Sequence, residues 1–215
     1  MLMGVCIVRE ADLRALGSEL TDLAPIVEGV LCMLAATVEQ PWPADAARVS
    51  MYQKLVNAVA ARATCVPLRF GEIFADEAAV GRALRLREGP ILQAIERVRG
   101  RVEWMVTLPA PTRAPAQVEL KPLTGRAFLE SRRAALGALP EPLPEQLRGL
   151  EAISSQWAWV DPATSAPGAP GHRRVCFLVP REFTAQVREL VAALSDDVRV
   201  TGPWAPAVFA AIRDE

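Results

Sequence analysis

Short apolar runs are spread along the whole chain and predict a protein with many strands. Runs rich in β-branched or aromatic residues and without a helical period are typical of buried strands. These runs are 4–9, 101–108, 156–160, 175–179 and 197–202. Residues 25–38 predict two further strands, or one long strand broken at Gly29.

Three other segments have the spacing of amphipathic helices. In 44–63, apolar residues recur at helical spacing on one face. Asp76 is placed to cap a second helix that breaks at Gly89-Pro90 and ends at Gly100. A third helix is predicted over 181–194. Its inward positions would be Phe183, Val187, Leu190, Val191 and Leu194.

The segment TCVPLRFGEIF, residues 64–74, predicts an irregular strand. Pro67 cannot donate a hydrogen bond to a neighbouring strand, so this strand belongs at a sheet edge or a bulge. Gly71 indicates a second irregularity a few residues later.

Prolines 109, 111, 115 and 122 indicate a linker over 109–122. It divides the chain into a domain over 1–108 and a smaller domain over 123–215, whose first helix is predicted at 123–136. The order of elements in the first part is close to that of a ferredoxin-like sandwich. The predicted fold class is therefore α+β, with a ferredoxin-like N-terminal domain followed by a smaller α+β C-terminal domain.

Charge and composition exclude several classes of protein. The 215 residues carry 24 basic and 25 acidic side chains, a net charge of −1, and 51% are hydrophobic. A nucleic-acid-binding or membrane-surface protein would have a basic excess. An arginine-rich segment over 82–101 is interleaved with glutamates, which is typical of a solvated helix with ion pairs. We therefore expect no nucleic-acid partner.

The four cysteines predict buried thiols. Cys6, Cys32, Cys65 and Cys176 each lie in an apolar run, and no two have the close spacing of metal ligands. The longest apolar run, 30–38, is much shorter than the roughly 18 residues of a membrane span. With no signal-peptide pattern at residues 1–8, we expect a cytoplasmic protein that holds no metal.

Catalytic residues are not indicated. His172 is the only histidine and lies in a loop-like segment, where a solvated side chain is the better interpretation. The sequence has no glycine-rich phosphate loop, no nucleophile elbow and no zinc-binding H-E-x-x-H. We therefore expect no enzymatic activity and no cofactor.

Five short motifs, in order along the chain, carry a resemblance to a known family. They are GVCIVR at 4–9, VPLRFGEIF at 66–74, GRVEWMV at 100–106, TGRAFL at 124–129 and GPWAPAVF at 202–209. Together they resemble the gas vesicle protein GvpL/GvpF family over roughly residues 3–210. The chain departs from the family pattern at Met51-Tyr52-Gln53, where a histidine is common, and at Ala207-Val208-Phe209, where Y-S-F is common.

The resemblance implies a non-enzymatic accessory protein of gas vesicle formation. Such a protein would assist assembly by binding the small hydrophobic shell protein and other gas vesicle accessory proteins, and would be associated with gas vesicles in the cytoplasm. Partner-binding candidates follow from the two most distinctive motifs. They are Pro67, Arg69, Phe70, Phe74, Pro203, Trp204 and Phe209. The alternative hypothesis is a regulatory or small-molecule-binding ferredoxin-like module unrelated to flotation, because one fold can host many functions.

Overall fold

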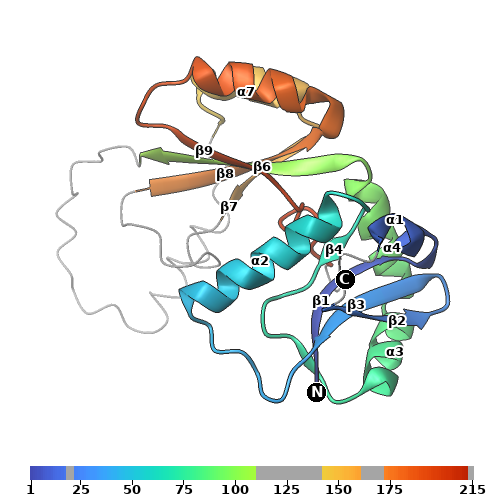
Figure 1. The fold of residues 1–215 in the computed structure, drawn as a ribbon. Coiled ribbons are helices and arrows are strands. Elements are labelled where there is room, and N and C mark those ends of the chain that lie inside the picture. Colours follow the sequence, from blue (N-terminus) through green and yellow to red (C-terminus); the bar gives the residue numbers. More distant parts are fainter. Residues whose placement is uncertain (18–21, 110–141, 161–171, 213–215) are drawn as a thin grey trace, which may run out of the picture.

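A computed structural model describes residues 1–17, 22–109, 142–160 and 172–212. They form two antiparallel sheets with helices on their faces (Figure 1). The predicted α+β class is therefore confirmed. Most of the predicted linker, the helix predicted at 123–136 and the fourth family motif lie outside the described residues.

The first sheet has the strand order β2-β3-β1-β4, and β5 also pairs with β1. Its elements are β1 (Leu2–Arg9), α1 (Leu13–Leu16), β2 (Ala24–Glu28), β3 (Leu31–Thr37), α2 (Ala46–Ala60), β4 (Val66–Pro67) and β5 (Ile73–Phe74). The order β1-α1-β2-β3-α2-β4 is consistent with a ferredoxin-like arrangement. Gly29, with φ +59°, forms the turn that divides the predicted 25–38 run into two strands.

Helices cover both faces of this sheet. Tyr52, Val56 and Val59 of α2 pack on one face with Val5 and Cys6 of β1. The other face packs against α3 (Glu77–Leu86) and α4 (Glu88–Val98). As predicted, the Asp76 side chain caps α3, accepting a hydrogen bond from Ala79 N at 2.7 Å.

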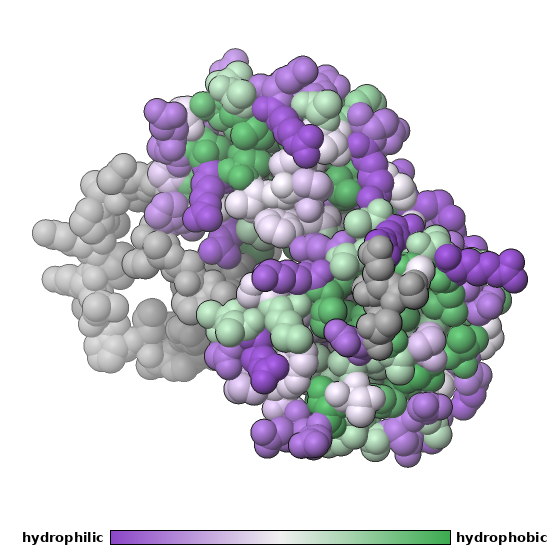
Figure 2. Space-filling model, in the orientation of Figure 1, coloured by the Kyte–Doolittle hydropathy of each residue, from purple (hydrophilic) through white to green (hydrophobic). Residues whose placement is uncertain are grey.

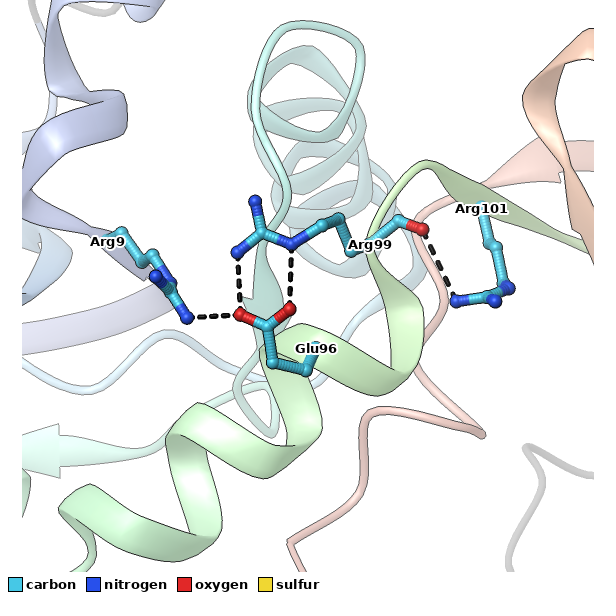
Figure 3. Close-up of polar contacts among 4 residues, drawn as sticks. All are labelled: Arg9, Glu96, Arg99 and Arg101. Atoms are coloured by element: carbon cyan, nitrogen blue, oxygen red, sulfur yellow. Dashed lines mark hydrogen bonds and ion pairs between the residues drawn. The ribbon is translucent and has the colours of Figure 1, made fainter.

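The turn after α4 leads the chain into the second sheet and is held by arginines (Figure 3). Glu96 accepts two hydrogen bonds from Arg99, at 2.6 and 2.9 Å, and a third from Arg9 of β1. Arg101 donates to the carbonyl oxygens of Arg97 and Arg99. The hydrogen bonds from Arg99, followed by the charges of Arg99 and Arg9, lower the pKa of Glu96.

The second sheet has the strand order β7-β8-β6-β9. Its elements are β6 (Arg101–Pro109), α6 (Arg148–Ile153), β7 (Gln156–Val160), β8 (His172–Pro180), α7 (Thr184–Ala192) and β9 (Arg199–Trp204). Short 3-10 turns at Glu10–Asp12, Glu145–Leu147 and Arg181–Phe183 precede α1, α6 and α7. Helices α6 and α7 cover one face of the sheet.

The membership of β6 corrects one detail of the predicted arrangement. The strand predicted at 101–108 exists, but it pairs with β8 and β9 and not with the first sheet. The change of sheet therefore falls at Gly100, ahead of the prolines. A second correction concerns Phe183, which is 38% exposed, although helical spacing placed it inward. The division into independently folding domains stays a prediction.

One apolar cluster joins the two halves of the structure, each of which consists of one sheet and its helices. Ile91 and Ile95 of α4 belong to the same buried cluster as Cys176 and Leu178 of β8. Phe209 of the C-terminal segment, which is residues 205–212 after β9, belongs to it as well. In Figure 1 that segment runs from β9 down between the halves. The four cysteines are all buried, as predicted.

Candidate functional site

The segment 66–74 forms two short strands separated by a loop. Both strands pair with β1, at Cys6↔Pro67 and Met3↔Ile73. Pro67 lies on the edge strand of the sheet, where its missing N–H is tolerated, as predicted. Gly71, with φ +82°, forms the loop between the strands, in a conformation that favours glycine.

Tyr52 of α2 holds this loop in place. Its hydroxyl oxygen lies 2.6 Å from the carbonyl oxygen of Leu68 and 2.9 Å from that of Val5. Its ring meets the Phe70 ring edge to face, with centroids 5.3 Å apart. Burial raises the pKa of Tyr52, so the hydroxyl stays protonated and available as a donor.

The C-terminal segment is tied to both halves by hydrogen bonds. Ala205 N donates to Asn57 Oδ1 of α2 at 3.0 Å, and Val208 N donates to Glu103 Oε2 of β6 at 2.8 Å. Arg97 of α4 donates to the carbonyl oxygen of Phe209 at 3.0 Å. Trp204, the last residue of β9, comes directly before this segment, and its indole N–H donates to Thr201 Oγ1 at 3.2 Å.

A cleft of about 900 Å³ lies between the two halves. One wall is α2 with the loop after β4, and the opposite wall is the face of the second sheet. The C-terminal segment lines the cleft between these walls. Figure 2 shows hydrophobic and hydrophilic side chains mixed over the face drawn in Figure 1, so the cleft is the better defined candidate site.

Three of the seven predicted partner-binding residues line this cleft. Pro67 and Phe70 lie on the α2 side, and Trp204, which is 41% exposed, lies on the other. The cleft therefore brings together the two most distinctive motifs, which are about 130 residues apart in sequence. Contact of these residues with a partner stays a prediction.

The other four predicted residues lie elsewhere. Arg69 and Pro203 are exposed outside the lining of the cleft. Phe74 packs against the cluster on the α3–α4 side of the first sheet. Phe209 is only 7% exposed and belongs to the same cluster, so in this structure it is a core residue.

The cleft also contains a buried acid that the sequence pattern did not single out. Glu103 is 3% exposed, between Val102 and Trp104 in an otherwise apolar strand. Burial raises the pKa of Glu103 to about 7, and hydrogen bonds from Val208 N and Cys176 Sγ lower it only in part. The signal in the sequence that could have identified Glu103 was its charge within a run of apolar residues.

Three further polar residues form a row across the second sheet. Thr107 of β6 lies opposite Arg174 of β8 on one side and Arg199 of β9 on the other. All three line the cleft. Sequence reasoning missed this row because it depends on strand register, which cannot be read from any one strand.

The described residues carry no metal-binding cluster. Within those ranges, no three His, Cys, Asp or Glu side chains are grouped so as to hold a metal ion. None of the helices described is long and apolar enough to cross a membrane.

Together, these features define a two-sheet α+β protein with a cleft between its halves. The family model of the gas vesicle synthesis protein GvpL/GvpF matches residues 5–211. Gas vesicle protein L of Streptomyces sp. (strain CB03234) is 31% identical over 231 aligned positions, covering 97% of this chain and 84% of that protein. The chain belongs to the GvpL/GvpF family.

Two crystal structures have a similar fold. Gas vesicle protein GvpF from Anabaena sp. PCC7120 is similar with a TM-score of 0.67 and 18% identity, covering 99% of this chain and 97% of that one. GvpF from Microcystis aeruginosa is similar with a TM-score of 0.65 and 16% identity, covering 98% of both chains. At these identities the likeness concerns the fold alone. Family membership favours a gas vesicle role over the alternative hypothesis of an unrelated module.

Proposed function

We propose that this chain is a non-enzymatic accessory protein of gas vesicle formation that binds the small hydrophobic shell protein through the cleft. In this role it acts in the cytoplasm, where it assists assembly of the shell together with other gas vesicle accessory proteins. One observation carries the proposal: the two motifs that distinguish the family, represented by Phe70 and Trp204, line the same cleft.

The chemistry of the cleft suits an apolar protein segment. Val49 and Val56 of α2 and Met105 of β6 contribute apolar surface, and the Phe70 and Trp204 rings lie at its sides. Aromatic side chains at such sites contribute a large share of binding free energy. A shell subunit that assembles through hydrophobic faces would aggregate if released alone, and a cleft of this kind would cover part of that face.

The test is recovery of the host's major shell protein on tagged chain after co-expression. We expect selective recovery by the wild type, and a loss of recovery of at least about tenfold for Trp204→Ala, as for a central aromatic contact. Phe183→Ala is the matched control, because Phe183 has a similar exposure of 38% but lies ahead of α7, outside the lining of the cleft.

Two results would count against the proposal. Wild-type recovery no greater than that of an unrelated hydrophobic protein would reject binding of the shell protein. Equal losses for Trp204→Ala and Phe183→Ala, with melting temperatures unchanged, would place the contact outside the cleft.

A further inference from the structure

The second sheet presents two arginines to the cleft at a fixed spacing. Arg174 and Arg199 each lie directly opposite Thr107, on the two strands that flank β6. Residues opposite each other in antiparallel strands project to the same face, and neighbouring strands are about 4.8 Å apart. The two guanidinium groups thus extend from backbones about 10 Å apart, with the Thr107 hydroxyl between them.

Neither arginine has a hydrogen-bond or ion-pair partner within the described ranges. Several other arginines of the chain, including Arg9, Arg85, Arg99 and Arg148, form ion pairs with glutamates. No hydrogen bond or ion pair is formed by Arg174, which is half-buried, or by the exposed Arg199 with any described residue. A half-buried guanidinium without a partner is a strong donor for an anion, because its charge is already partly removed from water.

The other ionisable groups of the cleft limit the charge of that anion. Asp197 also lines the cleft and offsets one of the two positive charges. Glu103 lies four residues from Thr107 along β6 and is engaged by Val208 and Cys176. His172 lies at the start of β8 and has contacts of its own. The balance suits a single carboxylate better than a multiply charged phosphate.

We propose that Arg174, Thr107 and Arg199 bind a carboxylate side chain carried by the apolar protein segment that occupies the cleft. The inference rests on the proposed function, since it specifies the chemistry of the segment that the cleft binds. The apolar surface of Val49, Val56 and Val160 surrounds the same space. A free carboxylate would leave most of the 900 Å³ unfilled, whereas an acidic residue flanked by apolar ones meets both the arginines and this surface.

The first experiment measures binding of the shell protein to charge variants of this chain. Arg174→Gln and Arg199→Gln should each weaken binding about tenfold or more, because each removes a charge-assisted hydrogen bond. Asp197→Asn should strengthen binding, because it removes the opposing charge. Arg173→Gln is the matched control: Arg173 is the neighbour of Arg174, but it stacks on Trp159, 4.1 Å from the ring centroid, outside the lining of the cleft.

The second measurement identifies the carboxylate on the partner. Each Asp or Glu of the shell protein is replaced in turn by its amide. One replacement should weaken binding to the wild type at least as much as Arg174→Gln does. The same replacement should cause a smaller loss in the Arg174→Gln background, and the smallest loss in a background that carries both Arg174→Gln and Arg199→Gln. Arg174→Lys should retain part of the affinity, since it keeps the charge but loses the fork of donors.

The outcomes separate this inference from the proposed function. If Trp204→Ala abolishes binding while both arginine variants bind like the wild type, the shell protein occupies the cleft and the carboxylate inference is wrong. If the wild type does not bind the shell protein, the proposed function fails. The inference is then tested with two capped peptides, acetyl-Leu-Glu-Leu-amide and its Gln counterpart, by chemical-shift titration against this chain. Preference for the Glu peptide that Arg174→Gln removes would support it, whereas equal or absent binding would overturn it.

Discussion

The Glu103 carboxylate accepts a hydrogen bond from the backbone N–H of Val208 at 2.8 Å. This contact joins the middle of the second sheet to the C-terminal segment, 105 residues later in the chain. Glu103 is almost completely buried, so the segment is held by a group whose charged form is costly at that position. The strength of this link should therefore depend on pH.

We predict that the contribution of Glu103 to stability decreases as the pH rises. Its pKa is about 7 in the folded chain, against an ordinary value of 4.5. The folded state therefore binds more protons than the unfolded state between these values, and the stabilisation present below about pH 4.5 is lost as the pH passes 7. The full loss is about 3 kcal/mol. Glu103→Gln should remove this dependence, which urea unfolding of both proteins from pH 4.5 to 8 would measure.

A control variant shows whether the change in pH dependence comes from the burial of Glu103 or from the loss of any carboxylate. Glu96→Gln removes an exposed carboxylate whose pKa is lowered, so it should not reproduce the effect. If the stability difference between Glu103→Gln and the wild type is the same at pH 5 and pH 8, Glu103 does not change its protonation in this range.

Removing the Tyr52 hydroxyl should loosen the loop that carries Phe70. The carbonyl oxygen of Val5 already accepts a hydrogen bond from Leu68 N, so the shorter contact with Leu68 O is the one that Tyr52 supplies. Tyr52→Phe should cost about 1–2 kcal/mol, because it leaves a part-buried carbonyl without its donor. Chemical denaturation would give this value.

The aromatic contact with Phe70 provides the comparison for Tyr52→Phe. Tyr52→Phe keeps the edge-to-face pair, whereas Tyr52→Leu loses both the pair and the hydroxyl and should cost more. Equal unfolding free energies for Tyr52→Phe and the wild type would show that water replaces the hydroxyl at no cost.

Much of the first half could be predicted from sequence because its signals are local. The turn at Gly29, the cap at Asp76 and the edge position of Pro67 each follow from the chemistry of one or two residues. Helix α2 ends three residues before the predicted boundary, since Ala61–Ala63 continue only as a turn. Helical spacing does not indicate where the last turn ends.

The features that could not be predicted depend on pairing between distant segments. Strand 101–108 was predicted, but nothing in GRVEWMV specifies pairing with 172–180 rather than with the first sheet. The row of Thr107, Arg174 and Arg199 has the same origin, because it exists only in one register of three strands. Motif resemblance selected Phe70, Trp204 and Phe209 alike, and could not distinguish the exposed Trp204 from the buried Phe209.

Asn57 should control how firmly the C-terminal segment is held against α2. Its side-chain oxygen accepts from Ala205 N at 3.0 Å. Asn57→Ala should increase amide hydrogen exchange at Ala205 and lower stability by about 1 kcal/mol. Gln53→Ala, one turn earlier on the same helix and also lining the cleft, should change neither. Unchanged exchange at Ala205 in Asn57→Ala would show that other contacts hold the segment.

Two glycines should differ strongly in how well they tolerate the same substitution. Gly202 has φ +145°, and a Cβ there would lie 2.9 Å from both the carbonyl oxygen of Glu103 and the Trp104 ring. Gly202→Ala should therefore cost about 2 to 4 kcal/mol, since neither the strand backbone nor a buried indole can move away easily. Gly89 lies in the first turn of α4 with open space around it, directly ahead of Pro90. Gly89→Ala should change stability by no more than about 0.5 kcal/mol, because the gain in helix propensity is offset by the contact of the new Cβ with the proline ring. Thermal melting of the two variants measures both effects, and a stable Gly202→Ala protein would mean that β9 can move away from β6 at this position.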